Sequence, residues 1–428
     1  MIKKSSPWLT LPAVLLLLPL LLQQAVRAEP EAPEAAPEWA APISITSLSA
    51  SSPFIPVVAA SPDGRTVMIV YNREISSGNR DPWFTRSSNN GTNWTAPQPI
   101  RTSPADSVQV HVTYDAGSRA HAVWREGSDL AYANDSNWTG TFRLLSQPGN
   151  IPPGASNPII VSSGANTLDV VWSEGIGNPD IYHIRSIDRG SNWSAKKAIA
   201  TTSPSSLVPA LAVDASGLLH AVWEEHPDPT KPAAGVIYYA QGTPAGSNNV
   251  NWTPVTPLSG TSDGRQPKII ADRNNTVHVS FTVFVSQSQQ YVYHLACKSN
   301  CTDILSWSNP SGSNPVSGAG ALAANLSDPV VISTMTTHRG CALVYFHGIQ
   351  VSESNERVLG VNSCDGWSAG GRDVVPSPGP RSLHPSITSQ NNWWVYLVYE
   401  QVQVTTTNRQ VFFVRNRPAL YMPIMLRQ

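Results

Sequence analysis

A unit of about 50 to 60 residues recurs through most of this chain of 428 residues, and the repeat constrains the fold more than any other feature. Each unit opens with an anchor residue, usually proline, at the start of a short apolar stretch. The anchors are Pro56, Gln109, Pro158, Pro209, Pro267, Pro329 and Pro385. About 15 residues after each anchor, beyond a turn rich in Asp, Asn or Gly, a second apolar stretch ends in an aromatic residue. These aromatic residues are Tyr71, Trp124, Trp172, Trp223, Phe281, Tyr345 and Tyr399. The pattern predicts two paired strands in every unit.

A third strand follows in each unit, for example at residues 181–184 and 236–239, and a turn closed by tryptophan comes after it. These tryptophans are Trp94, Trp138, Trp193, Trp252, Trp307 and Trp367. The seventh unit has no such tryptophan after residues 411–414, but Trp39 precedes the first anchor in a matching context. We therefore expect an all-β fold, a single β-propeller of seven four-stranded blades, with the N-terminal strand completing the last blade. A ring of six blades is the alternative.

Composition and charge exclude some classes of protein. The chain has 28 Lys and Arg against 29 Asp and Glu, a formal net charge of -1, so it lacks the basic surface of a nucleic-acid-binding protein. The 37 prolines, with frequent Val, Thr, Ser and Trp, argue against a helical protein. We expect no nucleic acid among its partners.

The N-terminus has the pattern of a signal peptide over residues 1–28. Lys3 and Lys4 precede an apolar segment at 9–22, which is shorter than the roughly 20 residues of a membrane-spanning helix, and Ala28 ends a plausible cleavage site. An uncleaved anchor is the alternative. We expect a lead-in rich in Pro, Ala and Glu at 29–42, the propeller at 43–416 and an apolar tail at 417–428. The protein is thus expected to be secreted, with cell-surface association through the tail as one option and no membrane span after cleavage.

The four cysteines allow three pairings. Cys297–Cys301 and Cys341–Cys364 are favoured because each pair falls inside one repeat unit, and an oxidising compartment favours disulfides over metal ligation. The spacing of Cys297 and Cys301 also suits zinc, but no second pair of ligands accompanies it.

Two of the turns before a tryptophan share a motif. Ser186, Asp188, Gly190 and Trp193 fit Ser-x-Asp-x-Gly-x-x-Trp, and Ser87, Asn89, Gly91 and Trp94 fit the same pattern with Asn in place of Asp. Ser and Asp or Asn accept backbone N–H bonds in a hairpin, Gly permits positive φ, and Trp packs onto the sheet. We expect these residues to stabilise the turn rather than to act in catalysis.

This motif resembles the Asp-box, or bacterial neuraminidase repeat, of the sialidase-like propellers. The resemblance implies three arginines that hold a substrate carboxylate, a Tyr–Glu nucleophile and an Asp acid/base. The first of these arginines belongs to an Arg-Ile-Pro motif, and here that place is Phe54-Ile55-Pro56. The departure removes one expected ligand of the carboxylate.

Other charged residues lie where the resemblance places a binding site. Arg265 precedes its anchor at the expected offset, and Arg381 lies close to another anchor. Acidic residues follow the second strand in several units. The candidate catalytic residues are Arg265, Arg381, Glu126, Glu174, Glu225, Glu400, Asp328 and His384, with Glu74 and Glu224 at similar positions. These side chains are expected to ring the mouth of the central channel, either as a polar rim exposed to solvent or as carboxylates spaced for glycoside hydrolysis.

Three histidines, His121, His220 and His278, recur at one strand position, three residues before the aromatic of their units. We expect them to be structural and expect no metal and no cofactor. The sequence favours a secreted binding or scaffold module for a glycan or a cell-surface protein. An exo-acting glycoside hydrolase of the sialidase type, with a diverged active site, is the alternative.

Overall fold

The structure is a computed structural model, and every structural statement below concerns the residues that it describes. These are residues 39–47, 53–136, 138, 142–145, 154–202, 204–226, 235–246, 248–260, 262–309, 315–317, 322–323, 330–350, 354–364, 367, 373–379, 381–390, 394–403 and 408–416. The expected signal peptide, most of the lead-in and the tail lie outside them and stay predictions. Ala35–Gln428 form one compact unit.

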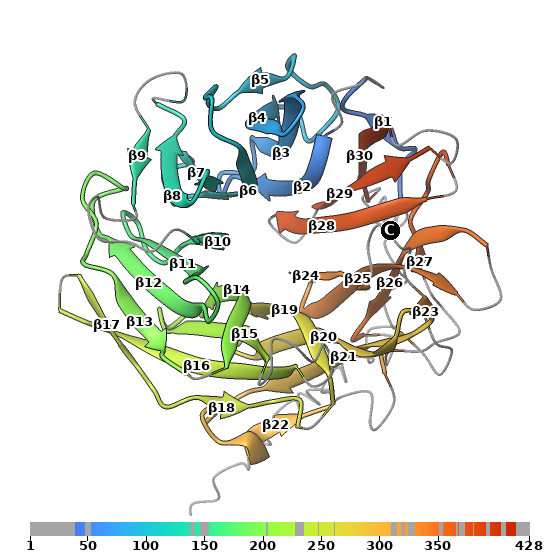
Figure 1. Cartoon of the computed structure of the whole chain (residues 1–428). Coiled ribbons are helices and arrows are strands. Elements are labelled where there is room, and N and C mark those ends of the chain that lie inside the picture. Colours follow the sequence, from blue (N-terminus) through green and yellow to red (C-terminus); the bar gives the residue numbers. More distant parts are fainter. Residues whose placement is uncertain are drawn as a thin grey trace, which may run out of the picture. The chain divides into compact units, whose positions relative to one another are not determined.

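Antiparallel β-sheets make up this unit (Figure 1), and the described residues contain a single short helical element, the 3-10 turn η1 (Ile304–Ser306). The first three repeat units form four-stranded sheets. Their strands are β2 (Pro53–Ala60), β3 (Val67–Ser76), β4 (Asn79–Ser87) and β5 (Gln98–Pro99); β6 (Ser107–Tyr114), β7 (Ala120–Glu126), β8 (Asp129–Asn134) and β9 (Arg143–Leu144); and β10 (Ser156–Ser162), β11 (Leu168–Glu174), β12 (Asp180–Ser186) and β13 (Lys197–Ala200).

The remaining units follow the same order with additions. The fourth contains β14 (Ser205–Val213), β15 (Leu219–His226), β16 (Val236–Ala245), β17 (Asn249–Trp252) and β18 (Thr256–Pro257). The fifth contains β19 (Gly264–Ala271), β20 (Val277–Ser286), β21 (Gln289–Cys297) and β22 (Trp307–Ser308), and β23 (Leu322–Ala323) joins it to the sixth, which contains β24 (Ser333–His338), β25 (Cys341–Gln350), β26 (Glu356–Asn362) and β27 (Asp373–Val374). The last contains β28 (Ser382–Gln390), β29 (Trp394–Val402), β30 (Arg409–Arg415) and β1 (Ile43–Ser44). Because β23 pairs with both β21 and β25, strand pairing alone counts the fifth and sixth units as one nine-stranded sheet.

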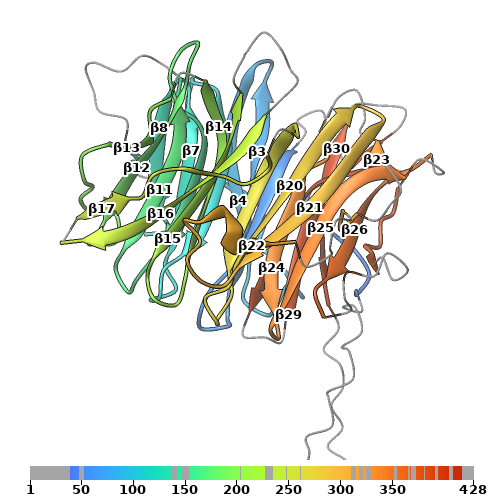
Figure 2. The ribbon, with the colours of Figure 1, turned by 90° about the horizontal axis from the view of Figure 1, so that it is seen from below.

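The sheets follow one another around a closed ring. The first strands of the units, β2, β6, β10, β14, β19, β24 and β28, contact each other in chain order, and β28 also contacts β2. These strands are innermost in Figure 1, whereas Figure 2 shows the sheets from the side. The described chain is therefore an all-β propeller, as the repeat predicted.

Burial explains why no sheet stands alone. Seven clusters of buried hydrophobic side chains each join two neighbouring units, and one of them joins Tyr396 and Phe413 of the last unit to Val58 and Tyr71 of the first. Each sheet covers its two faces with its neighbours, so the hydrophobic core of the ring is divided among the interfaces between sheets.

The N-terminal strand completes the last sheet, which confirms the expected closure. Ile43 pairs with Phe413, and Ser44 pairs with Phe412, in an antiparallel register. Further toward the N-terminus, Trp39 forms a bridge with Asn416, and the amide N–H of Ala40 donates to the carbonyl of Arg415 at 2.8 Å. The two ends of the propeller are thus held side by side by backbone hydrogen bonds.

Side chains organise the turn that follows β4. The hydroxyl of Ser87 accepts the N–H of Gly91 at 2.9 Å, and Oδ1 of Asn89 accepts the N–H of Asn93 at 2.9 Å. Trp94 then donates its indole N–H to the carbonyl of Gly91 at 3.2 Å. Every residue type of the motif makes the contact for which its chemistry suits it.

The turn after β12 has the same arrangement. Ser186 accepts the N–H of Gly190 at 2.8 Å, and Asp188 accepts the N–H of Asn192 at 2.7 Å. Gly190 has φ 83°, and a Cβ there would lie 1.9 Å from the hydroxyl oxygen of Tyr132 in the preceding unit. Both the backbone conformation and the close approach therefore require glycine.

The turn tryptophans also connect the sheets, because each contacts a ring of the preceding unit. The pairs are Trp94–Phe413, Trp138–Phe84, Trp193–Tyr132, Trp252–His183, Trp307–Tyr239, Trp367–His294 and Trp39–Tyr345. In the last pair the partner ring, that of Tyr345, belongs to a second strand and not to a third. Gly360 pairs with Tyr345 and stands at the third-strand position that carries the ring in the other units, where its missing side chain leaves room for Tyr345. Trp39 therefore makes across the closure the contact that the other six make within the chain.

Two disulfides are present, Cys297–Cys301 and Cys341–Cys364, which is the pairing that the sequence favoured. The first closes the loop before η1, and the second joins the start of β25 to the turn after β26. Because both sulfurs of Cys297 and Cys301 are in a disulfide, the less favoured zinc alternative is wrong.

The loops fall on two faces of the ring. The turns between third and fourth strands share a face with the turns between first and second strands, because the N–H of Arg189 donates to the carbonyl of Asn166 and its Nε lies 3.3 Å from Oδ2 of Asp115. The opposite face carries the segments before the first strands and the loops between second and third strands. We call it the anchor face; Arg265, Arg381 and Arg409 lie on it at strand starts.

Candidate functional site

The first strands carry an irregularity where they begin at the anchor face. In six of them, as far as the structure describes them, the register with the second strand shifts near the anchor, and a residue there has a left-handed backbone. This residue directly precedes the anchor in five units and is the anchor Gln109 itself in the other. These residues are Ile55, Gln109, Asn157, Val208, Gln266 and His384, with φ between 48° and 59°. A positive φ costs about 1–3 kcal/mol at such residues and is rarest for β-branched ones such as Ile55 and Val208.

Neighbouring side chains hold these strained residues in place. Glu400 accepts the N–H of Ile55, and Glu224 accepts the N–H of Gln266 at 2.7 Å. Oε1 of Gln109 accepts the N–H of Asn157 at 2.9 Å. The bulge releases an N–H from the ladder between strands, and a side chain of the preceding unit accepts it. Repeated bulges of this kind fix the shape of the channel mouth.

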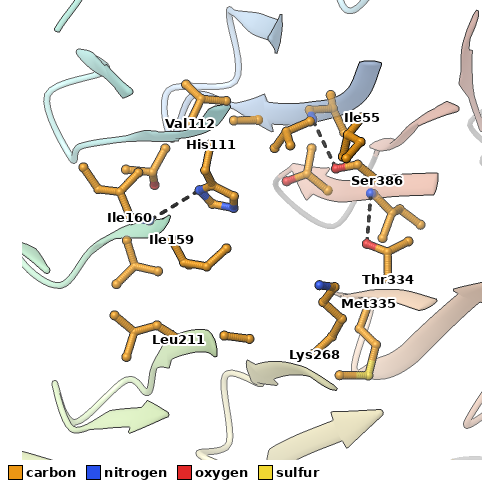
Figure 3. A pocket seen from close by; sticks show the side chains of 18 of the residues that line it. Ile55, His111, Val112, Ile159, Ile160, Leu211, Lys268, Thr334, Met335 and Ser386 are labelled. Atoms are coloured by element: carbon orange, nitrogen blue, oxygen red, sulfur yellow. Dashed lines mark hydrogen bonds between the residues drawn. The ribbon is translucent and has the colours of Figure 1, made fainter. Parts of the chain in front are cut away.

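The first strands enclose a cavity of about 520 Å³ along the axis of the ring. One layer of its lining consists of the residues at which pairing with the second strand resumes after the register shift, and these are Val57, His111, Ile159, Ala210, Lys268 and Ser386. Thr334 takes this place in the sixth unit, because it pairs with Tyr345 and, like His111 and Ser386, accepts a backbone N–H of the next first strand. Two of the seven carry ionisable nitrogens; Figure 3 shows His111 and Lys268 projecting into the same space.

The acidic residues after the second strands do not form an exposed rim, which corrects that expectation. Glu126, Glu174 and Glu225 are buried, and each accepts the indole N–H of the tryptophan two residues earlier. These contacts are Trp124–Glu126 at 2.6 Å, Trp172–Glu174 at 2.7 Å and Trp223–Glu225 at 3.3 Å. Side chains two residues apart in a strand point to the same face of the sheet. Each glutamate therefore lies beside the tryptophan that precedes it by two residues.

Further contacts leave these carboxylates little capacity for a ligand. Glu126 also accepts the hydroxyls of Ser103 and Ser107, and Glu174 also accepts the ammonium of Lys196. Burial raises the pKa of Glu225. We infer that the three carboxylates tie the loops of the anchor face to the sheets.

Glu400 is completely buried and lies at the seam between the last and first units. It accepts a hydrogen bond from Nη1 of Arg409 at 2.6 Å and lies 3.2 Å from Nδ1 of His384, in addition to its contact with the N–H of Ile55. Burial alone would raise the pKa of Glu400, but the charges of His384 and Arg409 outweigh burial and lower it. This carboxylate is therefore an ionised structural group.

Arg265 is paired within the protein. Its guanidinium forms a salt bridge with Asp263, in which Nη2 and Oδ2 are 2.7 Å apart, and lies over the ring of Phe284 at 4.2 Å. Asp263 also accepts the N–H of Gly235 at 2.9 Å. The salt bridge and the ring contact fix the plane of Arg265, and its charge is matched by its own neighbour.

Arg381 is similarly engaged. Its Nε lies 3.6 Å from Oε2 of Glu356, which is buried and also lies 3.3 Å from Nδ1 of His347. Among the candidates, His384 lines the central cavity, whereas Arg265, Arg381 and the four glutamates do not. Asp328 lies outside the described residues. Arg265 and Arg381 are the two arginines that the sequence offered, and each lies beside an acidic side chain of the protein. The structure does not join them to a third arginine in the group that the resemblance implies.

Sequence reasoning missed His111 and Lys268. Both directly follow the register shift of their first strands, and the corresponding positions of other units hold Val57, Ile159 and Ala210. A polar residue at a repeated apolar position was the available signal, and aligning the units from their anchors would have revealed it.

The recurring histidines are structural in their contacts. His121 and His220 each bridge a tyrosine hydroxyl and an aspartate: Tyr132 at 2.8 Å and Asp115 at 3.3 Å for the first, Tyr239 at 2.7 Å and Asp214 at 3.3 Å for the second. His278 lies 3.1 Å from His294. No group of three His, Cys, Asp or Glu side chains in the described part of the chain is arranged to hold a metal ion.

These buried imidazoles predict acid sensitivity. Burial lowers the pKa of His121, His220 and His278, and it lowers the pKa of His294 to about 3. A group whose pKa is lower in the folded state stabilises the protein above its unfolded pKa, near 6.5, and loses this contribution as the pH falls. Between pH 7 and 5, His294→Phe should therefore reduce the decline in unfolding free energy by about 2 kcal/mol, measured by urea unfolding. An unchanged decline would show that His294 is not held neutral.

Comparisons with known proteins identify the fold. No protein-family model matches the sequence, and no curated protein matches it. An ulvan lyase matches with a TM-score of 0.56 at 8% identity, covering 87% of this chain and 95% of that one. The phage phi92 endosialidase matches with a TM-score of 0.53 at 9% identity, covering 92% and 71%, and the Penicillium chrysogenum alpha-L-arabinanase with 0.50 at 12% identity, covering 89% and 99%. The chain shares the β-propeller fold of these proteins, and at these identities the likeness concerns the fold alone.

Proposed function

We propose that the protein is a secreted sialidase-like propeller that binds uncharged glycans on its anchor face and has no sialidase activity. The observation that carries the proposal is the pairing of arginines on this face with acidic side chains of the protein itself. The pairs are Arg80–Asp106, Arg265–Asp263, Arg381–Glu356 and Arg409–Glu400.

Such pairs suit hydroxyls better than a carboxylate. A ligand carboxylate gains most from a guanidinium whose charge is unmatched, and it would be repelled by the acid beside Arg265 or Arg381. A sugar hydroxyl both donates and accepts, so it can bond to either member of an ion pair without changing the charge balance. This preference for neutral ligands is part of the proposal.

Cation–aromatic contacts on the same sheets add rigidity. Arg73 lies over the ring of Trp83 at 4.5 Å, and Arg101 lies over that of Phe142 at 4.4 Å, as Arg265 does over Phe284. A guanidinium whose orientation is already fixed by a ring loses little conformational entropy when a ligand binds to it. These contacts favour a recognition surface that is formed before the ligand arrives.

The disulfides support export, and the structural comparisons support a glycan ligand. Disulfides persist in oxidising compartments, which agrees with the predicted signal peptide. In the described part of the chain, no helix is long and apolar enough to span a membrane. The ulvan lyase, endosialidase and arabinanase that share the fold are named for acting on glycans.

A diverged glycoside hydrolase is the second candidate. Asp81 has a pKa raised by burial and by the nearby charge of Glu126, as in an acid paired with a second carboxylate. Both side chains are buried, however, and Asp81 accepts the N–H of Ser103 at 3.1 Å. A hydrolase would need a different pair, open to substrate.

The experiment combines a fluorogenic sialoside with a glycan array, using the mature protein. We expect no turnover, together with retention of uncharged glycans that Arg265→Ala with Asp263→Ala weakens about tenfold or more. Arg65→Ala, an exposed arginine on the opposite face, is the matched control and should leave retention unchanged. Turnover that Arg265→Ala abolishes would overturn the proposal in favour of the hydrolase, and failure to retain any glycan would overturn the glycan ligand.

A further inference from the structure

Three polar side chains of the central cavity present hydrogens to its interior. His111, Ser386 and Thr334 each use an acceptor atom on the neighbouring first strand: Nδ1 of His111 accepts the N–H of Ile160 at 3.4 Å, the hydroxyl of Ser386 that of Val58 at 3.2 Å, and the hydroxyl of Thr334 that of Ile387 at 3.3 Å. Figure 3 shows these three bonds around the cavity. With the acceptors engaged, the remaining Nε2–H and O–H groups are donors.

His111 is neutral and has a defined tautomer. Burial, and secondarily the charge of Lys268, lower the pKa of His111 to about 4. Because Nδ1 accepts a backbone N–H, the single proton of the neutral ring lies on Nε2. Among the described residues Nε2 has no acceptor.

Lys268 adds a positive charge to this set of donors. Its side chain is enclosed by protein but reaches the cavity, and in the described part of the chain its ammonium has neither a hydrogen-bond acceptor nor a salt-bridge partner. Burial lowers the pKa of Lys268, and the charge of Glu224 offsets this only in part. The carboxylate of Glu224 already accepts the N–H of Gln266 and lies 3.3 Å from His226. As far as the structure describes it, the cavity lining contains no Asp or Glu.

An ammonium in such a space is energetically costly unless a counter-charge accompanies it. Val57, Ile159 and Ala210, in the same layer, show that the fold accommodates apolar side chains there. Among the described lining residues the charge of His384 is matched by Glu400, so the ammonium of Lys268 leaves one positive charge to compensate. One negative charge matches it, and a dianion would remain half compensated.

We propose that the central channel binds a small monoanion, a halide or the carboxylate of a small acid, held by the ammonium of Lys268 and the Nε2–H of His111. The hydroxyls of Ser386 and Thr334 supply further donors to the same anion. This site is distinct from the glycan surface of the anchor face, and it stands whether or not that surface binds glycans.

The test uses the mature protein in a sulfate buffer of fixed ionic strength, with bromide and acetate as probes. Protein-dependent broadening of the bromide resonance, competition by acetate, and a rise in the melting temperature with either anion are expected. Lys268→Met should weaken the affinity tenfold or more, whereas Lys298→Met, an exposed lysine outside the channel, should not change it.

The outcomes separate the alternatives. Bromide binding without acetate binding identifies a halide site, and the reverse identifies a carboxylate site. If the wild-type protein binds neither bromide nor acetate, or if Lys268→Met binds them as tightly as the wild type does, the proposal is overturned. Should Lys268→Met fail to fold, His111→Phe provides the second variant, for which we expect weakened binding with the charge retained; unaltered affinity in that variant would count against the assigned donors.

Discussion

Trp39→Ala should lower the free energy of unfolding by about 3–5 kcal/mol, because it removes a buried aromatic side chain at the point where the ring closes. Trp39 is 8% exposed and contacts Tyr345 edge to face, with the ring centroids 5.6 Å apart. Its loss also weakens the pairing of the N-terminal segment with β30. Urea unfolding of the mature protein measures the change, with a single transition expected.

Two controls separate closure from the loss of a tryptophan. Leu305→Ala alters a side chain that is 89% exposed and should stay within about 0.5 kcal/mol of the wild type. Trp193→Ala removes the equivalent contact with Tyr132 inside the chain. Amide hydrogens of β30 should exchange faster in Trp39→Ala than in Trp193→Ala; equal exchange in the two variants would contradict a special role of the closing strand.

Glu400→Ala should destabilise the protein by about 3–5 kcal/mol, since it leaves a buried cation without its partner. The carboxylate is fully buried and bonds to Arg409, while His384 and the N–H of Ile55 also depend on it. Glu400→Gln keeps the volume and should cost less. Thermal and urea unfolding measure both variants.

Glu74→Ala is the matched control for this position. Glu74 lies on the same face at the end of β3 but is only half-buried, and surface substitutions of this kind stay within about 0.5 kcal/mol. If Glu400→Ala and Glu74→Ala lower the free energy of unfolding equally, burial of the Glu400 charge does not explain the loss of stability.

The repeat was readable from sequence because the fold imposes the same demands on every unit. Each first strand must begin at the channel mouth and each second strand must bury an aromatic between sheets, so the anchors and residues such as Trp124 and Trp223 recur at a fixed spacing. The closing role of Trp39 followed from the one unit that lacked a tryptophan. Disulfide pairing followed as well, because each pair lies within a unit.

The candidate site was much less predictable, because sequence does not show which polar group faces which neighbour. Glu126 and Glu174 looked like rim residues, but each turns back to a tryptophan two positions away. Arg265 stood at the right offset for a ligand, yet Asp263, two residues earlier, occupies it. Lys268 went unnoticed because its meaning depends on strands about 50 residues away that enclose the channel with it.

The central claim is that the arginines of the anchor face are matched by the protein's own carboxylates and do not hold the carboxylate of a ligand. Titration calorimetry of the mature protein with a sialoside and with its methyl ester tests this claim most directly. We predict that the free carboxylate binds no more tightly than the ester, with or without Arg265→Ala. A preference for the carboxylate of tenfold or more, abolished by Arg265→Ala, would contradict the account.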